Sequence, residues 1–159
     1  MKKIKLTVGQ VSIVDDADFK KFGSIKWTAR WSKFTRSFYA VANSACGNGK
    51  RRKLLLHREI MGSPRGLFVD HRNHDTLDNR RKNLRSCTRS QNAANRGGLD
   101  SNNTSGERGV VLHKCGKWQA QIGMNGKTIY LGLFASKSKA AATYAAANKK
   151  NFGMFGGSL

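Results

Sequence analysis

One polar segment of the chain, residues 69–95, carries carboxylate, imidazole and amide side chains at short intervals. An adjacent Asp-His pair, Asp70-His71, is followed by several asparagines, and short apolar stretches interrupt the run. Carboxylate and amide oxygens are the ligands that a hard divalent cation such as Mg²⁺ prefers. A neutral imidazole beside such an ion can take a proton from an attacking water molecule. The residue types therefore predict a metal site with a general base next to it.

The local pattern predicts two short strands around this segment. Residues 67–71 are apolar and β-prone and follow turn residues at 62–66, so they should form the first strand. Residues 75–82 are rich in Asp, Asn and Arg and are expected to form a loop. Residues 84–87 suit a second strand.

A helix should follow the second strand. Thr88 is a good N-cap and Gln91 is its capping-box partner, so a helix is expected over residues 89–95, before a Gly-Gly pair. This order places Asp70 at a strand end and Asn92 in the first turns of the helix. The two side chains are then able to face each other across one ion.

These residues resemble the HNH endonuclease motif of phage and intron homing endonucleases, over residues 57–95. The similarity rests on Leu56-His57-Arg58, Asp70-His71, Asp78-Asn79-Arg80, Asn83-Leu84-Arg85 and Asn92. The third of these departs from the family's Asn-Asn-Arg. The resemblance implies a ββα-metal fold.

The resemblance also implies roles for four residues. Asp70 and Asn92 would bind the metal ion, Mg²⁺ or alternatively Mn²⁺. His71 would be the general base, and Asn83 would brace the loop and orient His71. Capping of turns is the alternative role for Asp70 and Asn92. The two other histidines of this region, His57 and His74, suit structural or phosphate-facing positions.

The charge of the chain points to a polyanionic partner. Its 159 residues include 30 Lys and Arg against 9 Asp and Glu, a formal net charge of +21 spread over nearly the whole length. Such a protein binds nucleic acid, because each neutralised phosphate releases condensed counterions. Five arginines near the polar segment are expected to contact phosphate: Arg51, Arg52, Arg72, Arg80 and Arg85.

Composition excludes several other classes of protein. No stretch approaches the roughly 20 apolar residues of a membrane span, and no basic amphipathic helix of useful length suits a membrane surface. The N-terminus lacks the apolar core of a signal peptide. The three cysteines are far apart and form no Cys-x-x-Cys pair, which argues against structural zinc and fits a reducing cytoplasm. The expected location is cytoplasmic, in a bacterial host if the gene belongs to a phage, as the resemblance implies.

Residues 1–56 are expected to form a mixed β region. Short strands are predicted at 4–8 and 11–14, an acidic-started helix or turn at 15–22, and further strands at 25–31, 34–42 and 50–56. A short helix at 57–61 leads into the polar segment. Five aromatics are expected in the core or as cross-strand pairs rather than as base-stacking platforms: Trp27, Trp31, Phe34, Phe38 and Tyr39.

The composition changes at residues 98–106, which are rich in Gly, Ser, Asn and Thr and are expected to be a linker. We therefore predict an α+β protein with a nuclease domain at 1–97, in which 57–97 is the ββα-metal part. A second domain is predicted at 107–159.

The second domain should be a three-stranded antiparallel sheet packed on one helix. Strands are predicted at 110–112, 118–122 and 128–133, with Asn125-Gly126 as a hairpin turn, and a helix at 139–149. Apolar residues alternate with glutamines in the second strand, so the helix should cover one face and leave the other face open.

This pattern resembles the APETALA/ethylene-response-factor type DNA-binding domain. The motifs are Arg108-Gly109-Val110, Trp118-x-Ala120-x-Ile122, Leu131-Gly132-x-Phe134, Ala140-Ala141-x-x-Tyr144-x-x-Ala147 and Phe152-Gly153. The resemblance implies that the open face enters the major groove, although plant members carry more Arg and Trp there. Expected DNA contacts are Arg108, His113, Lys114, Gln121, Lys127, Thr128 and Tyr130, with Arg108 and Gln121 reading bases and the lysines holding phosphate.

Together these features predict a metal-dependent, site-specific DNA endonuclease of the homing type. It would hydrolyse phosphodiester bonds and nick duplex DNA, without an obligate protein partner. The main alternative is a catalytically inactive DNA-binding regulator that keeps the same fold. An RNA-binding protein and a nonspecific nuclease are the remaining alternatives.

Overall fold

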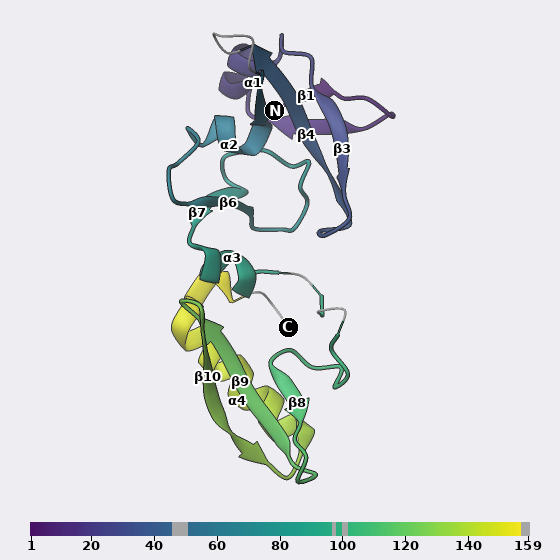
Figure 1. The fold of residues 1–159 in the computed structure, drawn as a ribbon. Coiled ribbons are helices and arrows are strands. Elements are labelled where there is room, and N and C mark those ends of the chain that lie inside the picture. The colour runs from purple at the N-terminus through teal and green to yellow at the C-terminus, as the bar shows by residue number, and fades with distance from the viewer. Residues whose placement is uncertain (46–50, 97, 100–101, 157–159) are drawn as a thin grey trace. The chain divides into compact units, whose positions relative to one another are not determined.

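The computed structural model describes residues 1–45, 51–96, 98–99 and 102–156. The chain divides into two compact units, Met1–Cys87 and Thr88–Leu159, and each is described by itself (Figure 1). Lys50, where a strand was predicted to begin, and residues 100 and 101 of the predicted linker lie outside the described residues. No helix in the described part of the chain is long and apolar enough to cross a membrane.

The first unit combines three small antiparallel sheets with short helices, which confirms a mixed α+β fold. Its elements are β1 (Lys2–Lys5), β2 (Val11–Val14), α1 (Asp16–Phe22), β3 (Thr28–Ser32), β4 (Ser37–Ala45), β5 (Arg51–Leu55), α2 (Leu56–Ile60), β6 (Phe68–His71) and β7 (Leu84–Cys87). β1 pairs with β2, β4 is central between β3 and β5, and β6 pairs with β7. The predicted strands are thus present, with boundaries shifted by a few residues.

One hydrophobic core joins the three sheets of the first unit. Val14, Trp27, Leu56 and Leu84 are buried together, and Ala40 and Ala42 contribute the inner face of β4. The indole nitrogen of Trp27 donates to the carbonyl of Phe22 at 2.9 Å, so this buried polar atom is satisfied. The core fixes the β6–β7 ribbon against the rest of the unit.

The aromatic residues of this unit divide into three groups. Trp27 lies in the core, and Trp31 and Phe38 form an edge-to-face cross-strand pair with ring centroids 4.9 Å apart, as predicted. Phe34 corrects the prediction, because it lies in the β3–β4 turn with 90% of its surface exposed. Tyr39 faces neither group and contacts the rings of His57 and His71.

The second unit contains a three-stranded antiparallel sheet, in the order β10-β9-β8, packed on one long helix. Its elements are α3 (Arg89–Ala94), β8 (Val110–Leu112), β9 (Trp118–Met124), β10 (Lys127–Phe134), α4 (Lys137–Phe152) and the 3-10 turn η2 (Gly153–Phe155). Figure 1 shows α4 lying along the sheet. α4 is longer than predicted, because Ser136 caps its start and Phe152 joins the core at its end.

The helix covers the predicted face of the sheet. Val110, Ala120 and Ile122 are buried, and Ala140 and Tyr144 of α4 pack against them. Small alanines on α4 allow the helix to approach the strands closely. The opposite face of β9 and β10 remains accessible, with Tyr130 58% exposed.

The helix α3 belongs to the second unit, so the compact units divide at residues 87–88, whereas the sequence suggested the linker at 98–106. Thr88 and Gln91 form the predicted capping box at its start. Ala94 at its end is buried with Ile122, Tyr144 and Phe152. This contact with the second core explains why α3 groups with the sheet that follows it.

Candidate active site

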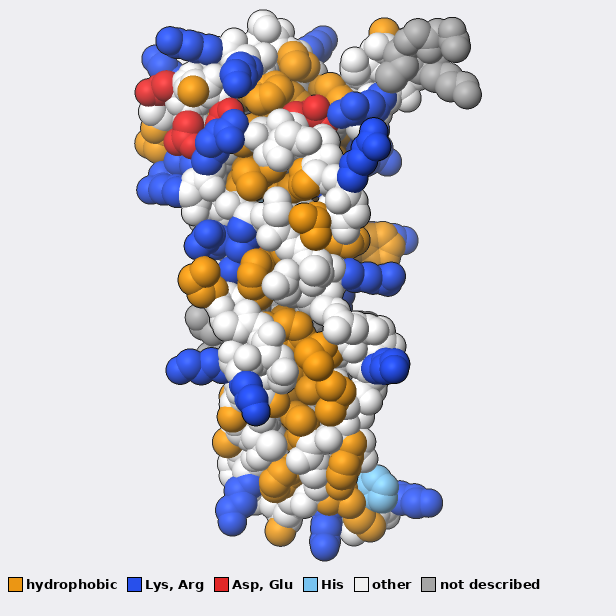
Figure 2. Space-filling view, turned by 90° about the vertical axis from the view of Figure 1, so that its left-hand side faces the viewer, with side chains coloured by type: hydrophobic (Ala, Val, Ile, Leu, Met, Phe, Trp, Pro, Cys, Tyr) orange, Lys and Arg blue, Asp and Glu red, His pale blue; other side chains and the backbone are white. Residues whose placement is uncertain are grey.

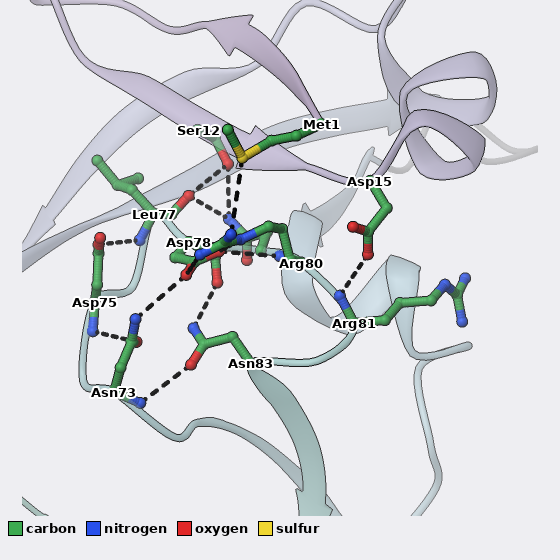
Figure 3. Close-up of polar contacts among 11 residues, drawn as sticks. Met1, Ser12, Asp15, Asn73, Asp75, Leu77, Asp78, Arg80, Arg81 and Asn83 are labelled. Carbon is green, nitrogen blue, oxygen red and sulfur yellow. Dashed lines mark hydrogen bonds and ion pairs between the residues drawn. The ribbon is translucent and has the colours of Figure 1, made fainter.

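The ring of His71 is held by a chain of buried hydrogen bonds. His71 ends β6 and is 5% exposed, and its Nε2 lies 3.1 Å from the Oδ1 of Asn79. The Nδ2 of Asn79 donates to the Oγ of Ser12 at 2.7 Å, and the hydroxyl of Ser12 donates to the carbonyl of Leu77 at 3.0 Å. Ser12 lies on β2, far away along the chain, and Figure 3 shows it beside Leu77.

This chain fixes which nitrogen of His71 carries the proton. The Ser12 hydroxyl proton is used on Leu77, so the Ser12 oxygen accepts from the Asn79 amide nitrogen. The amide oxygen of Asn79 must then face His71. Because an amide oxygen only accepts, Nε2 of neutral His71 holds the proton and Nδ1 is the basic atom.

His71 is also kept neutral. Burial lowers the pKa of His71 below its usual value, while the hydrogen bond with Asn79 and nearby aspartates oppose that shift. An imidazole with a lowered pKa is unprotonated at neutral pH. The site therefore presents a neutral base with a defined tautomer.

His57 lies beside His71 on the side of β4. The two imidazole centroids are 5.1 Å apart, and the Tyr39 ring is 5.6 Å from that of His57. Burial lowers the pKa of His57 to about 3, and repulsion from a protonated His71 and from Arg58 adds to that shift. His57 is thus a neutral, buried neighbour of the candidate base, in agreement with a structural position.

The lowered pKa of His57 predicts acid sensitivity of the fold. An unfolded histidine has a pKa near 6.5, so between pH 6.5 and about 3 the unfolded chain binds a proton that the folded chain does not. Stability is therefore complete above pH 6.5 and is lost as pH falls. One such group changes the free energy of unfolding by roughly 1.4 kcal/mol per pH unit, or about 2 kcal/mol between pH 6.5 and 5.

Urea denaturation at pH 7, 6 and 5 measures this effect. The His57→Phe variant should lose less free energy of unfolding between pH 7 and 5 than the parent protein. His71 contributes the same sign of dependence, so part of the slope should remain in the variant. Identical pH profiles for parent and variant would contradict the burial of a neutral His57.

The loop between β6 and β7 is braced by Asn83, as predicted. Its Oδ1 accepts from the backbone nitrogen of Asn73 at 3.1 Å, and its Nδ2 donates to the carbonyl of Asp78 at 2.7 Å (Figure 3). The side chain that hydrogen-bonds to the His71 ring is that of Asn79, for which the sequence predicted no role. The additional role of Asn83 in orienting His71 stays a prediction.

Further contacts tie this loop to the start of the chain. The backbone of Asn79 donates to Ile13 at 2.8 Å, and Ile13 donates to Leu77 at 2.9 Å. Arg81 makes two hydrogen bonds, at 2.9 and 2.7 Å, with the buried carboxylate of Asp18 on α1. β2 and α1 therefore support the loop of the candidate site.

Two arginines predicted to contact DNA are engaged within the protein. Arg80 makes a two-point contact with Asp78, through Nε at 2.7 Å and Nη2 at 2.6 Å, and holds the pKa of Asp78 below its usual value. Arg85 is 8% exposed, and its Nε donates to Asp70 at 2.9 Å. Asp70 is therefore the partner that stabilises the buried Arg85 cation, and the phosphate contact of Arg85 stays a prediction.

The other predicted phosphate contacts of this unit are more accessible. Arg51 and Arg72 are exposed, and Arg52 is half-exposed while pairing with Glu59 at 2.7 Å. A surface pair of this kind contributes little to stability. All three remain available for a polyanion.

Asp70 is buried and pairs with Arg85, and its binding of a metal ion stays a prediction. Arg85 engages its Oδ2, and a carboxylate can accept at both oxygens. Asn92 lies on α3 in the second unit and is half-buried, so its pairing with Asp70 stays a prediction. Among the described residues, no three His, Cys, Asp or Glu side chains cluster as a metal site. The predicted Mg²⁺ site differs from such a cluster, because its ligands would be one carboxylate, one amide and water molecules.

The second unit brings several of its predicted DNA contacts to the open face of the sheet. Tyr130 pairs with Gln121 across β9 and β10, and Thr128 pairs with Gly123, so these side chains share one face. Gln121 accepts a hydrogen bond from Gln119 at 3.0 Å. Lys114 is exposed in the β8–β9 turn, where Nδ1 of His113 lies 2.9 Å from Sγ of Cys115, and Lys127 is exposed at the start of β10.

Arg108 contacts the end of α3. Its guanidinium donates to the carbonyls of Ala93 at 3.1 Å, Ala94 at 3.3 Å and Arg96 at 2.8 Å. Carbonyls at the C-terminal end of a helix lack partners within the helix. Arg108 thus caps α3, and its contact with a base stays a prediction.

Positive side chains cover the surface. Figure 2 shows Lys and Arg spread over the visible face of both units, whereas Asp and Glu appear on that face only in the N-terminal unit. This distribution agrees with the net charge of +21 and with a nucleic-acid partner.

Comparisons with known proteins agree with both resemblances in part. The family model described as HNH endonuclease matches residues 58–94, which include His71, Asn79 and Asn83. The APETALA2-like protein 2 of Oryza sativa subsp. indica and that of subsp. japonica are each 54% identical over 39 residues, 23% of this chain. The match covers 9% of the length of each rice protein. No solved structure matches the chain. The HNH match supports a nuclease-type, DNA-related function.

Proposed function

We propose that the protein is a metal-dependent, site-specific DNA endonuclease of the homing type that nicks duplex DNA. The observation that carries this proposal is the buried chain from His71 through Asn79 to Ser12. It lies within the region that matches HNH endonucleases, except for Ser12. A neutral histidine with a defined tautomer, buried in a strongly basic protein, suits a general base that activates a water molecule for attack on a phosphodiester.

In the proposed reaction, Nδ1 of His71 takes a proton from a water molecule as that water attacks the phosphorus. The P–O3′ bond breaks, the leaving 3′ oxygen takes a proton from solvent water, and the products are a 5′ phosphate and a 3′ hydroxyl. Asn79 keeps the proton on Nε2 throughout, so that Nδ1 remains the basic atom. Mg²⁺, or Mn²⁺ in its place, held by Asp70 and Asn92, would stabilise charge on the phosphate and on the leaving oxygen.

The open face of the second unit is proposed to find the target. Gln121, Thr128 and Tyr130 lie together on it, and Lys114 and Lys127 flank it. A two- or three-stranded surface of this width can enter the major groove. With one His71 per chain, a single protein molecule cuts one strand, and a double-strand break requires a dimer or two successive nicks.

A cleavage assay on a random DNA library tests the proposal. We expect nicks with Mg²⁺ or Mn²⁺, sequenced ends that share a recognition site, and no product when EDTA removes the metal. Retention of a preferred DNA sequence without nicks in either metal would overturn the catalytic part. The protein would then be the DNA-binding regulator, an alternative that the Arg85–Asp70 ion pair favours because it places a cation on the proposed metal ligand.

A further inference from the structure

The outer face of the sheet β3-β4-β5 carries a hollow of about 410 Å³. The inner face of this sheet belongs to the core through Ala40 and Ala42. The register pairs Arg30 with Tyr39 on the outer face, because they alternate with the inward-facing residues. The residues of the hollow that carry charge or rings are Arg30, Trp31, Lys33, Phe34, Tyr39, Lys53 and His57.

Basic and aromatic side chains are combined in this hollow. Arg30, Lys33 and Lys53 supply positive charge, and its described lining contains no Asp or Glu. Tyr39 faces the hollow from β4, and Phe34 of the lining is the most exposed large hydrophobic residue in the described part of the unit. A protein-binding surface needs few cations, whereas a nucleic acid offers phosphates for the cations and base planes for the rings.

The hollow borders the candidate general base. Its wall includes His57, whose ring centroid is 5.1 Å from that of His71. Tyr39, another lining residue, is 6.3 Å from His71 by the same measure. A polyanion in the hollow would therefore pass close to the reacting atoms.

The β3–β4 turn that carries Phe34 is held in shape from within. Ser32 accepts a hydrogen bond from the backbone of Thr35 at 3.4 Å, and Ser37 donates to the Thr35 hydroxyl at 3.0 Å. The Trp31–Phe38 pair lies directly below the turn. The Nζ of Lys33 is 5.5 Å from the centre of the Phe34 ring, so a cation accompanies the exposed aromatic. This arrangement presents Phe34 to a partner on a fixed support.

We propose that this hollow binds duplex DNA beside the cleavage site and that Phe34 inserts between adjacent base pairs. Arg30, Lys33 and Lys53 hold phosphates of the strand next to His71. Exposed apolar side chains on basic surfaces act as wedges that unstack one base step and kink the duplex. The inference rests on the proposed function for its DNA substrate, but it concerns binding and requires no cleavage.

Binding to two 30-bp duplexes in EDTA tests the wedge, one fully paired and one with a central two-base mismatch. Unstacking costs least at a mismatch, so the parent protein should bind the mismatched duplex at least about 10-fold more tightly. Phe34→Ala should remove that preference and weaken binding to the mismatched duplex by about 5- to 150-fold. Phe34→Leu, which keeps an apolar wedge, should keep part of the preference, and Phe34→Trp, which also keeps a planar ring, should keep it.

The phosphate contacts are tested by the dependence of the same binding on salt. Arg30→Ala should weaken binding to both duplexes equally and reduce the slope of log K against log salt by about 0.9. Lys21→Ala, an exposed lysine of α1 outside the hollow, is the matched control and should leave the affinity and the salt slope unchanged.

Two results would overturn the inference. A mismatch preference that survives in Phe34→Ala would remove the wedge, and an unchanged affinity and slope in Arg30→Ala would leave the hollow to another partner, such as a protein. Loss of cleavage in the library assay with these binding results intact would overturn the proposed catalysis while supporting the wedge.

Discussion

Replacement of His71 by alanine is expected to reduce DNA nicking by about 10²- to 10⁴-fold, the range typical of a lost general base. The reason is local, because the hydrogen bond to Asn79 makes Nδ1 of this buried ring the basic atom. DNA affinity should change little, since His71 is 5% exposed and contributes no positive charge. Single-turnover nicking and equilibrium binding, measured on the same DNA, separate the two effects.

His74→Asn is the matched control for that experiment. His74 is an exposed histidine in the same loop with a positive φ of 64°, a conformation that asparagine tolerates. It should nick at the parent rate. Nitrogen NMR of neutral His71 should place the proton on Nε2, and Asn79→Ala should allow both tautomers. Equal losses of nicking and binding in His71→Ala would contradict its assignment as the base.

Gly109→Ala should unfold the second unit or come close to it. Gly109 has a φ of +65°, and a Cβ atom there would lie 2.1 Å from the Tyr144 ring and 2.6 Å from the carbonyl of Gln121. The left-handed backbone costs about 1–2 kcal/mol for alanine, and overpacking adds about 1–3 kcal/mol. A loss of roughly 3 kcal/mol or more is a large share of the stability of so small a unit.

Gly116→Ala provides a matched comparison. Its φ is +79°, but a Cβ atom there meets nothing within 4 Å, so only the backbone cost applies. Thermal unfolding of both variants, with hydrogen exchange of the β9 amides, should show a much larger loss for Gly109→Ala. Similar losses in the two variants would show that the contact with Tyr144 has no energetic weight.

The sequence predicted local structure well, because local signals determine it. The capping box of Thr88 and Gln91 set the start of α3, and the alternation around Ala120 identified the buried face of β9. Asn83 was expected to brace the loop, and its two hydrogen bonds to Asn73 and Asp78 do so.

Contacts between distant residues were not predictable in the same way. Asn79 belongs to the motif Asp78-Asn79-Arg80, yet its partner Ser12 lies 67 residues away on β2. Nothing in the spacing of a sequence relates two such positions. Asn79 can be identified only once the fold is known, because the fold shows that its side chain is buried and that both ends of its amide are hydrogen-bonded.

Arginines were expected at DNA from charge, and charge does not reveal the contacts that two of them make within the protein. Arg85 pairs with Asp70 inside the protein, and Arg108 caps α3. A guanidinium suits a carboxylate or a helix end as well as a phosphate. Phe34 was predicted to lie in the core or in a cross-strand pair, and it is exposed. A pattern of alternating aromatics does not distinguish a paired strand residue from one at the turn.

The place of α3 in the second unit affects how this protein could be recombined with others. A chimera that replaces residues 98–159 with a foreign DNA reader would remove Ile122, Tyr144 and Arg108, the supports of α3. Asn92 would remain in the sequence on a helix without its packing partners. Donor and acceptor modules should therefore be joined between Cys87 and Thr88, with an intact α3 carried by the incoming piece. In such a recombination the DNA-binding unit brings Asn92, one of the two proposed metal ligands. The nuclease unit would then cleave only when it is joined to a DNA-binding unit that supplies a matching ligand.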